Sequence, residues 1–231
     1  TDNSVEIIKK YEPWITYWES KKDRGQAHAI NKGMLLTSGD LLAWLNSDDF
    51  YLPHSLKHVA NAYAGRGDGL GAIVGLAHKV NHKGDIIYTP KIPELNFHAF
   101  LNWLNYSHFL QPSCFFLREA WKDVGPLNED LNYCFDLDLW LRISMKYSFI
   151  KLERVLSHAT VHDAAKTTAD RDRMRVEICL LIMKYGGEEI ARRELFRMAD
   201  ELTNAKAKLG QRSFFSRIGA AVAERFSVWR S

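Results

Sequence analysis

Apolar and polar positions along this chain follow two different periods, which alternate at short intervals. Helical spacing of apolar residues predicts helices, and compact apolar runs predict buried strands. After a first helix near Ser4, the predicted helices cover residues 26–37, 53–64, 94–104, 119–124 and 136–147. The predicted strands cover residues 14–18, 41–45, 72–80, 86–89, 113–117 and 149–162. Helices that alternate with buried strands indicate an α/β fold, a mainly parallel sheet sandwiched by helices in a Rossmann-like manner.

The pattern becomes helical throughout from about residue 169. We therefore expect two parts, an α/β domain over residues 1–168 and a helical C-terminal extension over residues 169–231. At helical spacing, one face of the last stretch carries Phe215, Ile218, Val222, Phe226 and Trp229. Such a helix either rests on an anionic membrane surface or packs against the domain or a second copy in a homodimer. The sequence leaves these interpretations open.

Composition and charge narrow the class of protein. With 231 residues, 46% hydrophobic and 26% charged, the chain is typical of an ordered globular protein. From Lys166 onward it holds 14 basic and 9 acidic residues, whereas the preceding part has a small acidic excess, which argues against a nucleic-acid partner. The three cysteines fit no metal or redox spacing, and no run approaches the roughly 18 apolar residues of a membrane span. We expect reduced thiols and a cytoplasmic protein.

Two adjacent carboxylates give the sharpest chemical signal. Asp48 and Asp49, in LNSDDFYLP (residues 45–53), follow the predicted strand 41–45 directly. Open α/β sheets bind ligands at the carboxyl ends of their strands. Adjacent carboxylates repel one another unless a cation lies between them, and Mg²⁺ or Mn²⁺ takes such oxygen ligands and bridges to a diphosphate. The residues alone leave a second interpretation open, in which both acids cap the helix that begins near Pro53.

A second acidic pair lies at the predicted start of helix 136–147. Asp138 and Arg142 are spaced i,i+4 and are expected to pair. Asp136 has no such partner in the local sequence, and a carboxylate of this kind beside a cleft can act as a general base. It can equally be an ordinary acid at a helix N-terminus.

A basic segment, DRGQAHAINKG (residues 23–33), precedes the first acidic pair. Arg24 and Lys32 are candidates for contacts with phosphate or base groups. Taken alone, the segment is also compatible with a turn followed by a solvated helix face.

Taken together, these segments resemble the family 2 inverting glycosyltransferases of the GT-A fold. TDNSVEIIKKY resembles the continuation of that family's Asp-Gly-Ser-Thr-Asp motif, and DRGQAHAINKG resembles its nucleotide-contacting segment. LNSDDFYLP resembles its metal-binding Asp-x-Asp region, while QPSCFF and CFDLDLWLR resemble its acceptor-side segment. The resemblance covers about residues 1–168. It implies transfer of a sugar from a nucleoside-diphosphate sugar, in the first place a UDP-sugar, to an acceptor hydroxyl with inversion.

The resemblance also implies roles on the donor side. Asp49 is expected to coordinate Mg²⁺ or Mn²⁺, and Asp48 to contact the ribose or share the ion. Arg24 and Asn31 are expected to line the nucleotide pocket. His162, in VHDAAKT, is expected near the ion or the diphosphate.

On the acceptor side, the resemblance implies that Asp136 is the catalytic base. The expected acceptor is a glycan or a lipid-linked glycan in polysaccharide or glycoconjugate assembly, at the inner face of the membrane.

The chain departs from the family pattern at its start and at two site positions. No strand precedes the first helix, so we expect the family's first strand to be missing. Asn46 replaces the first Asp of the metal motif, and Phe135 replaces a Glu before the base. Two alternatives follow, an incomplete domain that binds a partner without catalysis and a metal-dependent hydrolase. Paired histidines such as His54 and His58 have metal-like spacing but lack the inserted Glu of a zinc hydrolase.

Overall fold

The computed structural model describes residues 2–92, 94–105, 108–161 and 170–227, with side chains described up to residue 209. The helices are α1 (Ser4–Tyr11), α2 (Gln26–Leu36), α3 (Ser55–Ala64), α4 (Phe97–Leu101), α5 (Arg118–Val124), α6 (Phe135–Ser144), α8 (Arg171–Lys184) and α9 (Glu188–Ser227), with short 3-10 helices η1 (Glu12–Trp14) and η2 (Gln111–Ser113). The strands are β1 (Leu41–Leu42), β2 (Phe50–Tyr51), β3 (Leu70–Val80), β4 (Ile86–Tyr88), β5 (Cys114–Leu117) and β6 (Ser148–Thr160).

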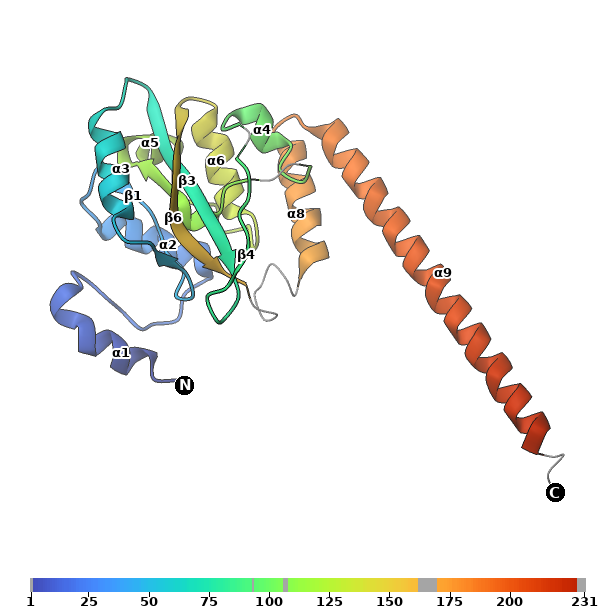
Figure 1. Cartoon of the computed structure of the whole chain (residues 1–231). Helices are drawn as coiled ribbons and strands as arrows, with labels where there is room; N and C mark the ends of the chain where they lie inside the picture. The colour runs from blue at the N-terminus through green and yellow to red at the C-terminus, as the bar shows by residue number, and fades with distance from the viewer. Residues whose placement is uncertain (1, 93, 106–107, 162–169, 228–231) are drawn as a thin grey trace. The chain divides into compact units, whose positions relative to one another are not determined.

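These elements form two compact units, Thr1–Ile178 and Cys179–Ser231. The first unit contains the sheet, drawn in Figure 1, and the part of α8 up to Ile178, while the predicted division at residue 169 stays a prediction. The second unit consists of the rest of α8 and the long helix α9. The apolar face predicted from Phe215 to Trp229 lies outside the side chains that the structure describes. Within the described residues, we find no helix with the length and apolar character needed to cross a membrane.

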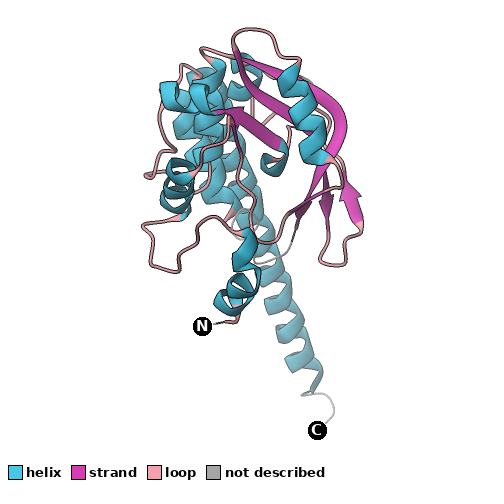
Figure 2. Cartoon of the chain, turned by 90° about the vertical axis from the view of Figure 1, so that its left-hand side faces the viewer, coloured by secondary structure: helices cyan, strands magenta, loops and turns pink. Residues whose placement is uncertain are grey.

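The first unit is built around one six-stranded sheet, with the order β1-β5-β3-β6-β2 and β4 added beside β3. Helices lie on both sides of this sheet (Figure 2), which confirms the predicted α/β class. The prediction of a mainly parallel sheet was wrong, because the sheet is mixed. Among the described strands only β3 and β6 run parallel, and the other four pairings are antiparallel. Apolar runs report the burial of a strand and carry no information about its direction.

Strand β3 lies between β5 and β6 at the centre of the sheet and is buried over most of its length. Two glycines allow its neighbours to approach closely. A Cβ atom at Gly75 would lie 2.3 Å from Leu156 of β6, and one at Gly71 would lie 2.5 Å from Tyr147, just before β6. The fully buried Trp140 and Leu141 of α6 complete the core beside this strand.

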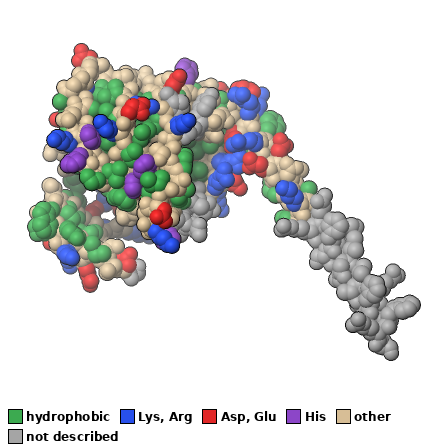
Figure 3. All heavy atoms as spheres, in the orientation of Figure 1, with side chains coloured by type: hydrophobic (Ala, Val, Ile, Leu, Met, Phe, Trp, Pro, Cys, Tyr) green, Lys and Arg blue, Asp and Glu red, His purple; other side chains and the backbone are tan. Residues whose placement is uncertain are grey.

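The predicted strand over residues 14–18 was also wrong. Pro13 falls in the first turn of η1, and Trp14 is 79% exposed. Aromatic and β-branched residues favour a strand only where a neighbouring strand and a packed face are available. No residue of α1 is buried, and Ile7 and Tyr11 are exposed. Hydrophobic side chains gather over the N-terminal segment with α1 and η1, at lower left in Figure 3.

Candidate functional site

A cavity of about 750 Å³ opens at the end of the sheet where β3 and β6 finish. Its walls come from residues 46–49, 109–112, 132–137 and 159–161, together with Gln26, Trp44, Lys79, Trp103, Trp140, Met174 and Ile178. Asp48, Asp49 and Asp136, three of the carboxylates predicted from the sequence, therefore line the same cavity. This volume lies in the range of small-molecule and cofactor sites.

Sheet pairing explains how Asp48 and Asp49 reach this wall. Strand β2 follows them directly and pairs antiparallel with β6, with Phe50 opposite His158. The residues just before β2 consequently lie beside the end of β6. There, the backbone N–H of Thr160 donates to the Asp49 carboxylate at 3.0 Å, and the Thr160 hydroxyl donates to the carbonyl of Asp48.

Asp49 is also fixed from the other side. The Asn46 amide donates to the second carboxylate oxygen of Asp49 at 3.0 Å, and Gln26 of α2 donates to the Asn46 side-chain oxygen at 3.1 Å. Burial raises the pKa of Asp49, while the hydrogen bonds from Thr160 and Asn46 act in the opposite direction and the nearby charge of Asp48 adds to the increase. A cation beside this carboxylate would stabilise its charged form.

The donor set fits a divalent cation that shares its ligands with a substrate. Both oxygens of Asp49 accept a hydrogen bond, and an ionised carboxylate has further lone pairs for a cation. Asp48 is exposed and lines the cavity beside it. Among the described side chains there is no group of three or more His, Cys, Asp or Glu that could hold a metal by itself. Mg²⁺-type sites commonly use one or two carboxylates, with waters and substrate phosphates as the other ligands.

Asp136 lies in the first turn of α6, partly buried in the cavity wall. Its carboxylate accepts a hydrogen bond from the backbone N–H of Leu137 at 2.7 Å. Burial, the largest influence, raises the pKa of Asp136 to about 6, and the negative charge of Glu177 adds to this increase. A carboxylate with a pKa near the working pH is suited to general acid–base chemistry.

The neighbouring acid, Asp138, has a different role. It is buried and pairs with Arg142 at 2.8 Å, which confirms the predicted i,i+4 pair. Arg142 also donates to the carbonyls of Val124, Gly125 and Pro126. This pair therefore fastens α6 to the loop after α5.

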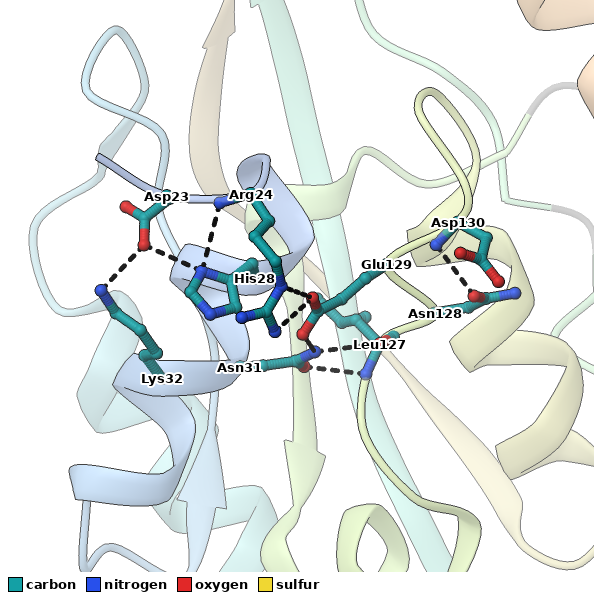
Figure 4. A network of polar contacts seen from close by, with 9 residues as sticks. All are labelled: Asp23, Arg24, His28, Asn31, Lys32, Leu127, Asn128, Glu129 and Asp130. Carbon is teal, nitrogen blue, oxygen red and sulfur yellow. Dashed lines mark hydrogen bonds and ion pairs between the residues drawn. The ribbon is translucent and has the colours of Figure 1, made fainter. Parts of the chain in front are cut away.

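Arg24 and Asn31 lie away from the cavity wall, on a contact between α2 and residues 127–129 (Figure 4). Arg24 is 71% exposed and pairs with Glu129 at 2.8 Å. Asn31 is buried, and its side chain both donates to the carbonyl of Leu127 and accepts from its N–H. The expected nucleotide contacts of these two residues stay predictions. Lys32 pairs with Asp23 and Glu19.

The remaining predicted ligand, His162, lies outside the described residues. Other wall residues were missed by the sequence reasoning. Gln26 lies in the DRGQAHAINKG segment but was not singled out there, and Thr160 belongs to no motif; their places in the wall follow from contacts between distant segments. In the sequence, Trp44 is one residue of an apolar run. In the structure its ring stacks on that of Trp140 in the cavity wall, with the ring centroids 5.8 Å apart.

Comparison with known proteins now assigns the family. The sequence model described as Glycosyl transferase family 2 matches residues 1–124, more than half of the chain. The chain belongs to glycosyl transferase family 2. Asp48 and Asp49 of this family 2 chain lie inside the matched span, and Asp136 lies beyond it.

Curated relatives of this family 2 chain are themselves uncharacterised glycosyltransferases. One from Rickettsia typhi is 27% identical over 172 residues, which is 72% of this chain and 53% of the relative. One from Mycobacterium tuberculosis is 35% identical over 83 residues, 32% of each chain. The matched part of the chain thus spans about half the length of the Rickettsia relative and about a third of the length of the Mycobacterium relative.

Solved structures show that the fold is GT-A. S. aureus TarS 1-349 in complex with UDP-GlcNAc matches with a TM-score of 0.60 and 14% identity, over 84% of this chain and 60% of that chain. The mannosyltransferase PcManGT from Pyrobaculum calidifontis, in complex with GDP-Man and Mn²⁺, matches with a TM-score of 0.57 and 18% identity, over 80% and 52%.

Proposed function

We propose that this protein transfers a sugar from a nucleoside-diphosphate sugar to an acceptor hydroxyl with inversion. The observation that carries the proposal is the cavity in a family 2 chain whose wall contains Asp48, Asp49 and Asp136. A UDP-sugar is the first donor to test, since TarS was solved with UDP-GlcNAc, and a GDP-sugar is the second, since PcManGT was solved with GDP-Man.

Asp49 and Asp48 form the donor end of the proposed site. They would hold Mg²⁺ or Mn²⁺ together with the diphosphate of the donor. The ion, when bound, supplies positive charge that offsets the charge developing on the leaving diphosphate. The hydrogen bonds from Thr160 and Asn46 keep the Asp49 carboxylate in one orientation, so it is preorganised for this task.

Asp136 forms the acceptor end. Its carboxylate takes the proton from the acceptor hydroxyl, whose oxygen forms a bond to the anomeric carbon on the face opposite the diphosphate. The bond from the anomeric carbon to the diphosphate oxygen breaks in the same displacement, which inverts the anomeric centre. Holding both substrates in one cavity converts an encounter in solution into an oriented reaction.

Three further residues are proposed to contact the donor because of the family resemblance of their segments. Arg24 and Asn31 would contribute to the nucleotide side, and for Arg24 this requires its exposed side chain to leave Glu129 when the nucleotide arrives. His162 would contribute at the diphosphate. Trp103 and Trp44 give the cavity aromatic walls, which suit the apolar faces of sugar rings.

For the wider role, we propose a glycan or lipid-linked acceptor and action in polysaccharide or glycoconjugate assembly in the cytoplasm, at the membrane surface. The C-terminal helices would supply a membrane contact with the help of the basic residues from Lys166 onward, or a homodimer contact through the apolar face from Phe215 to Trp229.

Calorimetry with a panel of UDP- and GDP-sugars, with and without Mn²⁺, tests the donor. Metal-dependent binding of one donor is expected, followed by formation of an inverted glycoside when acceptors are added. Release of free sugar without any acceptor would favour a hydrolase. Absence of binding to every donor with the metal present would replace the enzymatic proposal with a partner-binding role.

A further inference from the structure

The turn that precedes α6 is held by one carboxylate from a distant helix. The backbone N–H groups of Asn132, Tyr133 and Cys134 all donate to Glu177 of α8, at 2.9, 2.6 and 2.9 Å. The Cys134 thiol also donates to Glu177 at 3.3 Å. Glu177 is partly buried and belongs to the same compact unit as the cavity.

Glu177 holds the turn that leads into α6, up to and including the N-cap residue. Cys134 is the N-cap residue of α6, and its side chain makes no capping hydrogen bond to the helix. A carboxylate near a helix N-terminus also interacts favourably with the helix dipole. Burial acts to raise the pKa of Glu177, but the three backbone donors and the thiol lower it on balance, so the side chain is held as an anion.

The same turn forms part of the cavity wall. Asn132, Tyr133 and Cys134 line the cavity, and Asp136 follows two residues later. A second contact holds the turn from the same direction, since the Tyr133 hydroxyl donates to Asp170 at 2.9 Å. The position of Asp136 in the wall thus depends on contacts with residues 170–177.

Glu177 also acts on Asp136 through its charge, because a nearby negative charge disfavours ionisation of a carboxyl group. The other titratable groups that face Asp136 are the buried thiols of Cys114 and Cys134. Asp48, Asp49 and Lys79 share the cavity wall with it.

We propose that Glu177 is the positioning residue for Asp136: it fixes the turn at residues 132–134 in place and couples its own charge to the Asp136 carboxyl. The role of Asp136 as a catalytic base rests on the proposed function, whereas the physical coupling between Glu177 and Asp136 does not. Glu177 lies outside the span matched by the family, which ends at residue 124.

Two measurements that need no substrate test this coupling. The first is an NMR titration of the Asp136 side-chain carboxyl, assigned with Asp136→Asn. The second is hydrogen exchange of the amides of residues 132–134. Both are made on the full chain for the wild type, for Glu177→Gln and for the control Glu153→Gln, which removes the same charge at a side chain that is 73% exposed.

In Glu177→Gln, the titration midpoint of Asp136 is expected to fall by about 0.5 to 1 pH unit, because a like charge has been removed. The amides of residues 132–134 are expected to exchange about tenfold faster, since a neutral acceptor binds them more weakly. Glu153→Gln is expected to change neither quantity. An unchanged midpoint in Glu177→Gln would overturn the proposal, even if exchange were faster, because Glu177 would then be a scaffold only. Full transfer activity in Asp136→Asn would instead refute the proposed base and leave both NMR results standing.

Discussion

The carboxylate of Asp49 accepts a hydrogen bond at 3.0 Å from the backbone N–H of Thr160, a residue 111 positions later in the chain. The contact joins the turn before β2 to the last residue of β6, which pair antiparallel. The orientation of the acidic pair is therefore set by the sheet. It is not set by the helix that follows, because α3 begins at Ser55 with no side-chain cap from its N-cap residue, His54.

If Asp49 holds a divalent cation with the donor, Asp49→Asn should weaken metal-dependent binding of the nucleotide-sugar by at least about tenfold, because a neutral amide attracts the cation far less. Calorimetry with Mn²⁺ measures this affinity, with UDP-GlcNAc as the donor or with whichever donor the panel identifies. Asp68→Asn, in an exposed loop, removes the same charge and should bind as the wild type does. Equal affinity in the two variants would contradict the metal role of Asp49.

Asp136→Asn should lower the rate of transfer by about 10² to 10⁴, the range typical of a lost general base, while donor binding is retained. In the wild type, kcat/KM should fall as the pH drops through about 6, because the pKa of Asp136 is raised to about 6 and its protonated form cannot accept a proton. A profile from pH 4.5 to 8.5 measures this. A rate that stays constant down to pH 4.5 would show that another group accepts the proton.

The same pKa predicts a cost in stability. The pKa of Asp136 in the folded protein, about 6, lies above the ordinary value of 3.8, so its contribution to stability is complete below about 3.8 and is lost as the pH rises through about 6. Asp136→Asn should therefore raise the free energy of unfolding by about 1–2 kcal/mol at pH 8 and change it little at pH 3.5. Urea denaturation at the two pH values measures this difference. A variant that is less stable than the wild type at pH 8 would contradict the assignment.

Local patterns were sufficient for most of the helices and longer strands and for the acidic residues, although they missed β2 and misplaced a strand at residues 14–18. The helix over residues 26–37 and the strand over residues 72–80 follow from periodicity, and α2 and β3 closely match them. The pairing of Asp138 with Arg142 was predictable for a similar reason, since both lie on one helix turn. Strand direction was not predictable, because it depends on how long connections cross the sheet.

The partners of the site residues were the harder part. The sequence shows Asn31 only as a polar position of a helix with basic residues nearby. In the structure its side chain forms hydrogen bonds with the backbone of Leu127, 96 residues away. Glu177 reads as one charge among many in a helical stretch. Its hydrogen bonds to the turn before α6 arise only once α8 has packed there. Local sequence cannot supply such contacts, because tertiary packing determines them.

Asn31 gives a prediction that separates structure from binding. Asn31→Ala should lower the free energy of unfolding by about 2–3 kcal/mol, because it leaves the N–H and C=O of Leu127 buried without their hydrogen bonds. Asn31→Asp keeps the acceptor for the N–H but should cost at least as much, because it brings a buried carboxylate against the Leu127 carbonyl and the Glu129 carboxylate. Denaturant titration measures both. If the folded Ala variant also binds nucleotide more weakly than the wild type, the expected nucleotide contact of Asn31 gains support; unchanged affinity would restrict Asn31 to a structural role.

Gly75 tests whether close approach of β3 and β6 holds the wall of the site. A Cβ atom at this position would lie 2.3 Å from the buried side chain of Leu156 and 3.0 Å from the carbonyl of Arg154. Gly75→Ala should therefore destabilise the protein by about 1–3 kcal/mol, as overpacking commonly does. Gly67→Ala is the matched control, because nothing lies within 4 Å of the added carbon there.

A double-mutant cycle with Leu156→Ala then identifies the cause. If the clash with Leu156 dominates, Gly75→Ala should cost at least about 1 kcal/mol less in the Leu156→Ala background than in the wild type. Equal costs in the two backgrounds would place the strain at the Arg154 carbonyl instead. That carbonyl cannot be trimmed away, so β6 would have to shift, and Thr160 would move relative to Asp49. Weaker metal-dependent donor binding in Gly75→Ala alone would then follow from the sheet itself, although every residue of the cavity wall is unchanged.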